Sequence, residues 1–127
     1  MRGTILAAVE DLIFLSKILE TAKHVKAEVR VVSPGDLAAA LDQGPAAAVF
    51  FDLNHGSGSA VETIRRIKQS QTHPAVPFIG FLSHMQGDLA RAAREAGCDE
   101  VMARSAFAQQ LPQLLRRYAE GAGAGSR

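Results

Sequence analysis

Cysteine, tryptophan and long apolar runs are scarce or absent in this sequence, and each absence excludes a class of protein. The single cysteine, Cys98, excludes an internal disulfide. The longest unbroken apolar run, 46–51, has six residues, whereas a helix needs roughly 20 to cross a bilayer. The net charge of +1 offers no basic patch to a nucleic acid or an acidic membrane. We therefore expect neither as a partner.

The N-terminus also lacks the plan of a secretory signal peptide. Residues 1–4 carry one charge, and two acidic residues follow at Glu10 and Asp11. We therefore expect a cytoplasmic protein. The chain has 127 residues, of which 47% are apolar and 21% are charged, and this profile is typical of one ordinary globular domain.

Short apolar runs alternate with amphipathic stretches along the chain. The apolar runs predict strands over 5–9, 28–32, 46–51, 78–82 and 101–103. The amphipathic stretches predict helices over 11–26, 36–43, 88–96 and 108–118, with another through Val61, Ile64 and Ile67. Strands separated by helices cannot form hairpins, so we expect an α/β fold with a parallel sheet, right-handed crossovers and helices on both faces.

Local signals mark several ends of these elements. Asp11 is a suitable cap for the first helix. Apolar residues recur there at helical spacing from Leu12 on, and we expect Leu15, Ile18 and Leu19 on its buried face. Gly97 is expected to end the helix over 88–96. Residues 121–127 are rich in Gly, Ala and Ser, so we expect a flexible tail after a domain that spans 1–120.

Acidic residues stand where two of the predicted strands end. Glu10 and Asp11 follow the first strand, and Asp52 follows the third. In open parallel sheets, polar sites form at the carboxyl ends of the strands. The alternative is that Asp11 only caps a helix and Asp52 only ends a strand. Because three acids occur at two strand ends, we favour a common site.

Three segments resemble the receiver domains of bacterial response regulators. They are 48–54 (AVFFDLN), 77–81 (PFIGF) and 93–100 (AREAGCDE), and the resemblance covers residues 4–118. It implies a flavodoxin-like (βα)5 fold, that is, a doubly wound parallel five-stranded sheet of order 2-1-3-4-5. It also implies a single-domain signalling protein of a two-component or phosphorelay system, which is not an enzyme and acts through protein–protein contacts.

The same resemblance assigns roles to individual residues. Asp52 matches the phosphoacceptor, Glu10 and Asp11 match the acidic pair that holds Mg2+, and Asn54 matches the residue whose carbonyl completes the metal site. Mg2+ is therefore the implied cofactor if the acidic site is functional, and its charge would offset that of carboxylates and phosphate. A shift of one residue would instead place Val9 and Glu10 at the pair. We prefer the first alignment because it buries the apolar face of the next helix.

The departures from the family pattern lie in the switching residues. The family has a Thr or Ser hydroxyl where this chain has Leu82, and Ser83 follows as a candidate substitute. Its Lys-Pro pair is replaced by Arg104-Ser105, so we expect a trans peptide there. Arg104 keeps the charge of the lysine but not its compact shape. At the position of the family's aromatic switch residue, this chain has Val101. These changes favour a second hypothesis, a phosphorylation-independent pseudo-receiver.

Other residues have simpler explanations. His55 and His84 stand on loops near Asp52, where a transition-metal site is conceivable but exposed loop histidines are commoner. Cys98 is expected to be a small buried residue. A third hypothesis, a small enzyme or ligand-binding domain, lacks any phosphate-binding or nucleophile motif in its support.

Partners are also implied by the resemblance. They are a histidine kinase or phosphotransfer protein and a downstream protein. The apolar residues at the end of the chain are mostly expected in the core, and part of them should lie on the face of the fourth helix, fifth strand and fifth helix. The resemblance suggests a homodimer through this face. The whole apolar set consists of Leu89, Val101, Ala103, Phe107, Leu111, Leu114 and Leu115.

Overall fold

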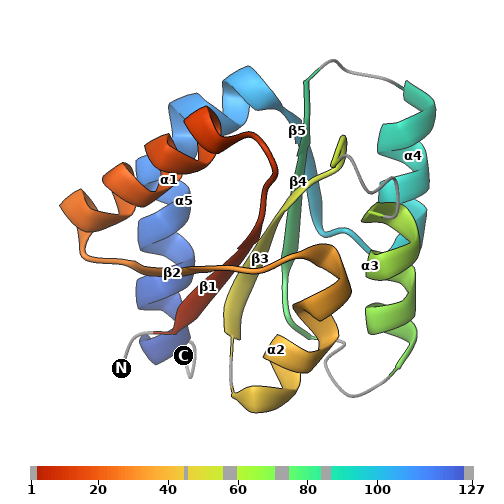
Figure 1. Cartoon of the computed structure of the whole chain (residues 1–127), viewed down its shortest axis with the longest axis horizontal. Helices are drawn as coiled ribbons and strands as arrows, with labels where there is room; N and C mark the ends of the chain where they lie inside the picture. The colour runs from red at the N-terminus through yellow and green to blue at the C-terminus, as the bar shows by residue number, and fades with distance from the viewer. Residues whose placement is uncertain (1–2, 45, 56–59, 71–74, 84–86, 125–127) are drawn as a thin grey trace.

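A computed structural model describes residues 3–44, 46–55, 60–70, 75–83 and 87–124. Its centre is a five-stranded sheet of order β2-β1-β3-β4-β5, in which every neighbouring pair of strands is parallel. Helices cover both faces of this sheet (Figure 1). The predicted fold class and strand order are therefore confirmed.

The elements follow the predicted alternation closely. The strands are β1 (Thr4–Ala8), β2 (Glu28–Val31), β3 (Ala46–Asp52), β4 (Phe78–Leu82) and β5 (Glu100–Ala103). The helices are α1 (Leu12–Val25), α2 (Leu37–Gln43), α3 (Ala60–Gln69), α4 (Gly87–Ala96) and α5 (Arg104–Ala124), and a short 3-10 turn, η1 (Pro34–Asp36), precedes α2. Most ends lie within one or two residues of the prediction. The helix α5 is the main difference, because it begins four residues earlier and ends six residues later than the predicted 108–118.

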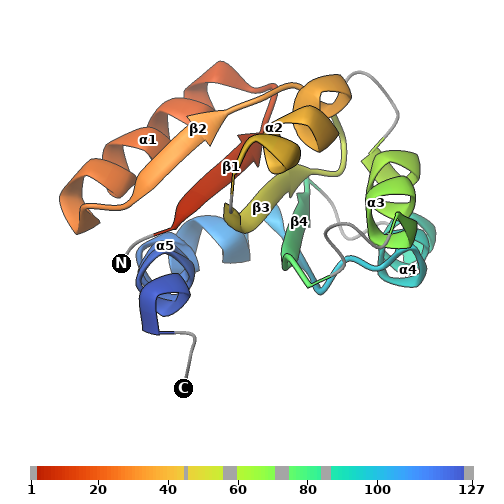
Figure 2. The ribbon, with the colours of Figure 1, turned by 90° about the horizontal axis from the view of Figure 1, so that it is seen from below.

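The sheet has an apolar layer on each side. On one side α1 and α5 pack over a cluster that includes Ile5 and Phe50, and on the other α2, α3 and α4 pack over Leu6 and Phe51 (Figures 1 and 2). Neighbouring residues of one strand thus enter opposite layers, as the pleat of a strand requires. This is why β3 reads as a continuous apolar run rather than as an alternating one.

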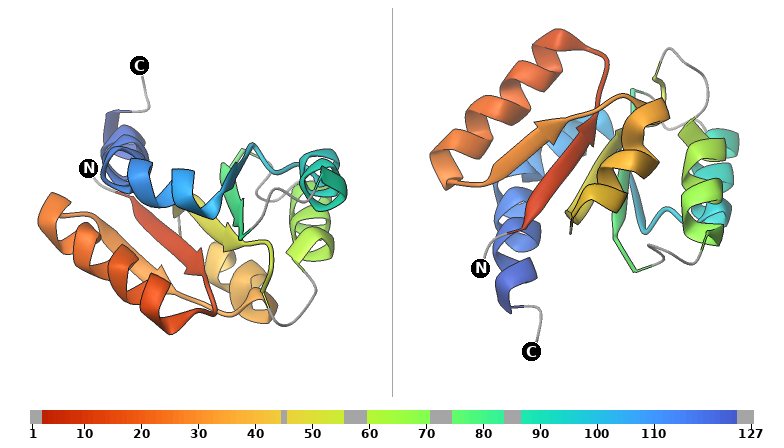
Figure 3. Two further views of the ribbon diagram at one scale, coloured as in Figure 1. Left: turned by 90° about the horizontal axis from the view of Figure 1, so that it is seen from above. Right: turned by 60° about the horizontal axis from the view of Figure 1, so that its bottom comes forward.

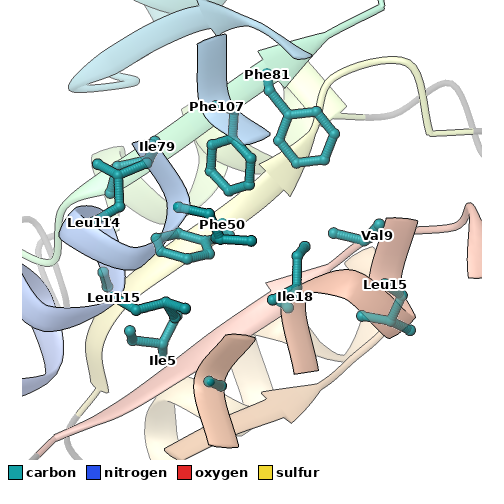
Figure 4. Close-up of a cluster of buried hydrophobic side chains, with 14 of the residues drawn as sticks. Ile5, Val9, Leu15, Ile18, Phe50, Ile79, Phe81, Phe107, Leu114 and Leu115 are labelled. Carbon is teal, nitrogen blue, oxygen red and sulfur yellow. The ribbon is translucent and has the colours of Figure 1, made fainter. Parts of the chain in front are cut away.

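Four phenylalanines form the centre of the layer under α1 and α5. Phe107 stacks on Phe81 with ring centroids 4.6 Å apart, and its centroid lies 5.2 Å from that of Phe50 and 5.9 Å from that of Phe14. Figure 4 shows Phe107 from α5 lying next to Phe81 and Phe50 of the sheet. The first turns of α1 and α5 are therefore fixed against the same strands.

The start of α1 is set by Asp11, whose Oδ1 accepts hydrogen bonds from the backbone N–H groups of Ile13 and Phe14 at 2.9 and 3.1 Å. The predicted cap is confirmed. Leu12, the first apolar residue of the helical pattern, is 76% exposed. It lies in the first turn and at the margin of the buried stripe, so the sheet does not reach it.

The helix α5 changes direction along its length (Figures 1 and 3). Pro112 lies inside this helix. A proline has no N–H for the carbonyl four residues earlier and its ring crowds that carbonyl, so Pro112 accounts for the bend. The bend lets one helix bury Phe107 near the carboxyl edge of the sheet and Leu115 farther along.

The ends of the remaining helices agree with the prediction except at the C-terminus. Gly97 follows α4 with a φ of +115°, as a glycine that ends a helix often does. The helix α5 runs to Ala124, four residues into the segment predicted as a tail, and 125–127 lie outside the described residues. Within the part of the chain that the structure describes, no helix is long and apolar enough to span a membrane.

Candidate functional site

The candidate site lies at the carboxyl edge of the sheet. Because the strands are parallel, the ends of β1, β3 and β4 and the beginning of α5 meet at this edge. Asp11 follows β1, Asp52 ends β3, Ser83 follows β4 and Arg104 opens α5. The contacts among these residues show which of the predicted roles the arrangement can support.

Asp52 is half-buried at the end of β3. Its Oδ1 accepts a hydrogen bond from the Asn54 backbone N–H at 2.9 Å, and the backbone N–H of Glu10 also donates to its carboxylate. Burial raises the pKa of Asp52, and this effect outweighs the two backbone hydrogen bonds and the electrostatic influence of His55 and Arg104, which lower it. The β1 end, the β3 end and Arg104 thus share one electrostatic environment.

Ser83 lies against Asn54. The Asn54 side-chain Oδ1 accepts from the Ser83 backbone N–H at 2.7 Å and from the Ser83 hydroxyl at 2.9 Å. Leu82, at the family's hydroxyl position, is fully buried. The chain therefore has a hydroxyl at this edge, but one residue later than the family pattern and engaged with the residue two positions after Asp52.

Arg104 binds the side chain of Asp11. Its Nη2 donates to Asp11 Oδ2 at 2.5 Å, across 93 residues of sequence. The Arg104 guanidinium also lies over the ring of Phe14, with 4.4 Å between its central carbon and the ring centroid. The hydrogen bond from Arg104 is the largest cause that lowers the pKa of Asp11, and the bonds of the helix cap add to it.

These contacts change the predicted metal site. Asp11 uses one carboxylate oxygen for the α1 cap and the other for Arg104. Among the described residues, no three His, Cys, Asp or Glu side chains are grouped so that they could hold a metal ion. The predicted set of Glu10, Asp11, Asp52 and Asn54 as Mg2+ ligands therefore stays a prediction, and the contacts show what Asp11 and Asp52 bind in its place here. Glu10 approaches Asp52 through its backbone, and Asp11 turns to Arg104.

The other candidate residues are two histidines and a cysteine. His55 is described and half-buried beside Asp52, whereas His84 lies outside the described residues. Cys98 is buried, and burial raises the pKa of its thiol to about 11. It is thus the small buried residue predicted. The described residues contain no cis peptide bond, so the Arg104–Ser105 bond is trans.

Sequence reasoning missed Phe14. This residue is buried in α1 three positions after Asp11, and its ring supports the guanidinium that binds Asp11. An aromatic residue one turn after an acidic cap is the signal that could have found it, but the arginine it supports stands in a distant part of the sequence.

Known proteins match this chain in structure but not in sequence. No protein-family model and no curated protein matches the sequence. Solved structures do match. A putative response regulator from Chloroflexus aurantiacus has a TM-score of 0.81 at 16% identity, over 93% of this chain and 98% of that one. The chemotaxis protein CheY4 of Vibrio cholerae has 0.79 at 12%, over 93% and 99%.

A third match is the phosphorylated cyanobacterial phytochrome response regulator RcpA, with a TM-score of 0.78 at 18% identity over 93% of this chain and 94% of that one. The chain has the receiver-domain fold. The resemblance inferred from the three segments is thus confirmed at the level of the fold, over nearly the whole described chain. The identities are too low to carry the function of these receivers over to this chain.

We expect Asp52→Asn and Asp11→Asn to shift the melting temperature of this receiver-fold chain in opposite directions at pH 7. Burial raises the pKa of Asp52, so its ionised form opposes folding and the neutral amide removes that cost. The lowered pKa of Asp11 means that its stabilising contribution is present above the unfolded-state pKa and is lost as the pH falls through the folded-state pKa.

Thermal melts from pH 7 down to pH 3 would test both signs. The gain from Asp52→Asn should vanish below the ordinary Asp pKa of 3.8, where both states hold the proton. The loss from Asp11→Asn should shrink over the same acid range. Asp88→Asn, at a highly exposed position, is the control and should change little. A lower melting temperature for Asp52→Asn at pH 7 would contradict the assignment.

Proposed function

We propose that this chain is a signalling module of the receiver type in a two-component or phosphorelay system. It acts through contacts with other proteins rather than as an enzyme. The receiver fold supports the proposal, as does an aspartate at the carboxyl end of β3, the position that the family uses as phosphoacceptor. A histidine kinase or phosphotransfer protein and a downstream protein are the proposed partners, and the cytoplasm is the proposed location.

We further propose that its partner contacts do not depend on phosphorylation of Asp52. The observation that carries this is the commitment of both Asp11 oxygens to the α1 cap and to Arg104. A phosphate can switch a protein only if it interacts differently with two states. The buried Leu82 stands where the family has the hydroxyl that binds the phosphoryl group. The half-buried Val101 stands where the family has its aromatic switch residue.

A second candidate function is a receiver that accepts phosphate on Asp52. The Asp52 carboxylate faces two backbone N–H donors, and Arg104 adds positive charge nearby. Ser83 could supply the missing hydroxyl after releasing Asn54. Mg2+ could be held by Asp11 in this mode only after that carboxylate leaves Arg104.

Acetyl phosphate distinguishes the two candidates. The protein is incubated with acetyl phosphate and Mg2+, and intact mass is recorded for wild type, Asp52→Asn and Asp88→Asn, with an established phosphate-accepting receiver as positive control. We expect no phosphoryl adduct on the wild type, because Asp11 is not free to bind Mg2+. An adduct that Asp52→Asn removes and Asp88→Asn keeps would establish the second candidate instead.

The domain limits and the oligomeric state are proposals of the same kind. We propose one receiver domain over 1–120. On the face of α4, β5 and α5, Leu89, Val101 and Ala103 are partly buried, whereas Phe107 and Leu111 belong to the core. A homodimer would therefore use the first three. Sedimentation of wild type against Leu89→Glu would test this surface.

A further inference from the structure

We propose that Arg104 is a built-in cation that takes the place of a divalent metal at the carboxyl edge of the sheet. While Arg104 binds Asp11, the edge does not take up Mg2+. The inference deepens the proposed function and rests on it, since it concerns how the same edge is regulated in a receiver-type module. The family pattern has a lysine at this position, and the inference gives the arginine of this chain a role of its own.

The first step concerns the ligands that a metal would need. Mg2+ binds through carboxylate oxygens and demands near-ideal octahedral geometry. Asp11 has no uncommitted oxygen, because Oδ1 accepts from two backbone N–H groups of α1 and Oδ2 accepts from Arg104. Asp52 receives hydrogen bonds from the backbone of Glu10 and Asn54. A metal at Asp11 would have to compete with the guanidinium at Oδ2 and with the helix cap at Oδ1.

The second step concerns how firmly Arg104 is held. It is the first residue of α5, and Phe107, one turn later, is completely buried among the core rings. The guanidinium rests on the ring of Phe14, and its side chain is 34% exposed. The backbone is thus fixed by the core and the head group by a ring and a carboxylate. A loose surface arginine would have neither support.

The third step concerns charge. Arginine keeps its proton at every pH at which the protein folds, so its positive charge at this edge is permanent. It acts on Asp52 as well as on Asp11. One cation thus favours the charged form of both acidic groups. A divalent ion would gain less from these carboxylates and would be repelled by the guanidinium.

Removing this charge is therefore expected to create a metal site. We would titrate Mn2+ into the wild type and into Arg104→Gln, and follow the paramagnetic broadening of amide NMR signals. In Arg104→Gln the amides of Glu10, Asp52 and Asn54 should broaden selectively, with an apparent affinity at least about tenfold higher than in the wild type. Excess Mg2+ should reverse the broadening.

Two further variants control for charge and for ligand. Arg117→Gln removes one positive charge from the same helix, where Arg117 pairs with Glu100 away from this edge, and it should not gain affinity. Asp11→Asn in the Arg104→Gln background should lose the gain, because the amide is a poor Mg2+ ligand. Arg104→Met is a second neutral replacement should Arg104→Gln fold poorly, and dispersed NMR spectra report folding in each case.

The outcomes separate this inference from the proposed function. Equal Mn2+ affinity in wild type and in the two neutral Arg104 variants would overturn the role of Arg104 and leave the signalling proposal standing. A gain that Arg117→Gln shares would overturn it as well, since the effect would then be one of overall charge. A selective gain in the Arg104 variants, with no gain in Arg117→Gln, supports the inference.

Discussion

Phe107→Ala is expected to lower the free energy of unfolding by about 3–5 kcal/mol. The ring is completely buried and packs against Phe14, Phe50 and Phe81. Its removal would leave a cavity between α5 and the sheet, lined by rings that cannot collapse to fill it. Since small domains unfold with about 5–15 kcal/mol, this single change takes away a large share of the total.

Urea denaturation followed by circular dichroism measures this loss. Ile13→Ala is the control, because Ile13 is 85% exposed and its truncation should change stability by no more than about 0.5 kcal/mol. The ring contact between Phe14 and Arg104 should also weaken in Phe107→Ala, since Phe107 anchors the first turn of α5. A loss below about 1 kcal/mol would mean that the aromatic cluster is not close-packed.

Gly80→Ala is expected to cost about 1–3 kcal/mol through overpacking. A Cβ atom at Gly80 would lie 2.9 Å from Leu53 Cγ and Cδ1, which is closer than real Cβ contacts occur. Leu53 is buried and directly follows Asp52, so it cannot move without disturbing the end of β3. Shifts of the Asp52 and Asn54 amide signals should therefore accompany the loss of stability.

A double-mutant cycle with Leu53→Ala identifies the contact. The double variant should lose less stability than the sum of the two single losses, because the alanine methyl at position 80 enters space that Leu53 has vacated. Gly35→Ala serves as the matched control, since a Cβ there meets no atom within 4 Å. Strict additivity between positions 80 and 53 would refute the steric explanation.

The sequence was sufficient to predict the fold because its signals agree with one another. Apolar runs such as β3 are buried on both faces, and the stretches between the runs are too long for hairpin turns and long enough for helices. Asp11 and Gly97 mark helix ends by mechanisms that depend on local backbone geometry alone. Such local rules can be applied without knowing what lies nearby in space.

The arrangement of the candidate site was harder to predict, because it depends on pairs that are distant in the sequence. Asp11 is equally suitable as a cap, a metal ligand or an ion-pair partner, and only the position of Arg104 decides among them. Arg104 was expected between the last strand and the last helix, which was predicted over 108–118. The structure begins α5 at Arg104 itself, and this brings its side chain onto Phe14.

One of the two outermost strands of the sheet, β2, has a consequence for the protein at high concentration. It pairs with β1 on one side, and its other backbone edge has no strand beside it within the sheet. Glu28 and Arg30 are exposed along β2, and Arg30 Nη1 also donates to Gln43 Oε1 at 3.2 Å. Charged side chains on an outer strand discourage a second molecule from adding its own strand. The open edge is thereby guarded against the growth of intermolecular sheets that leads to aggregation.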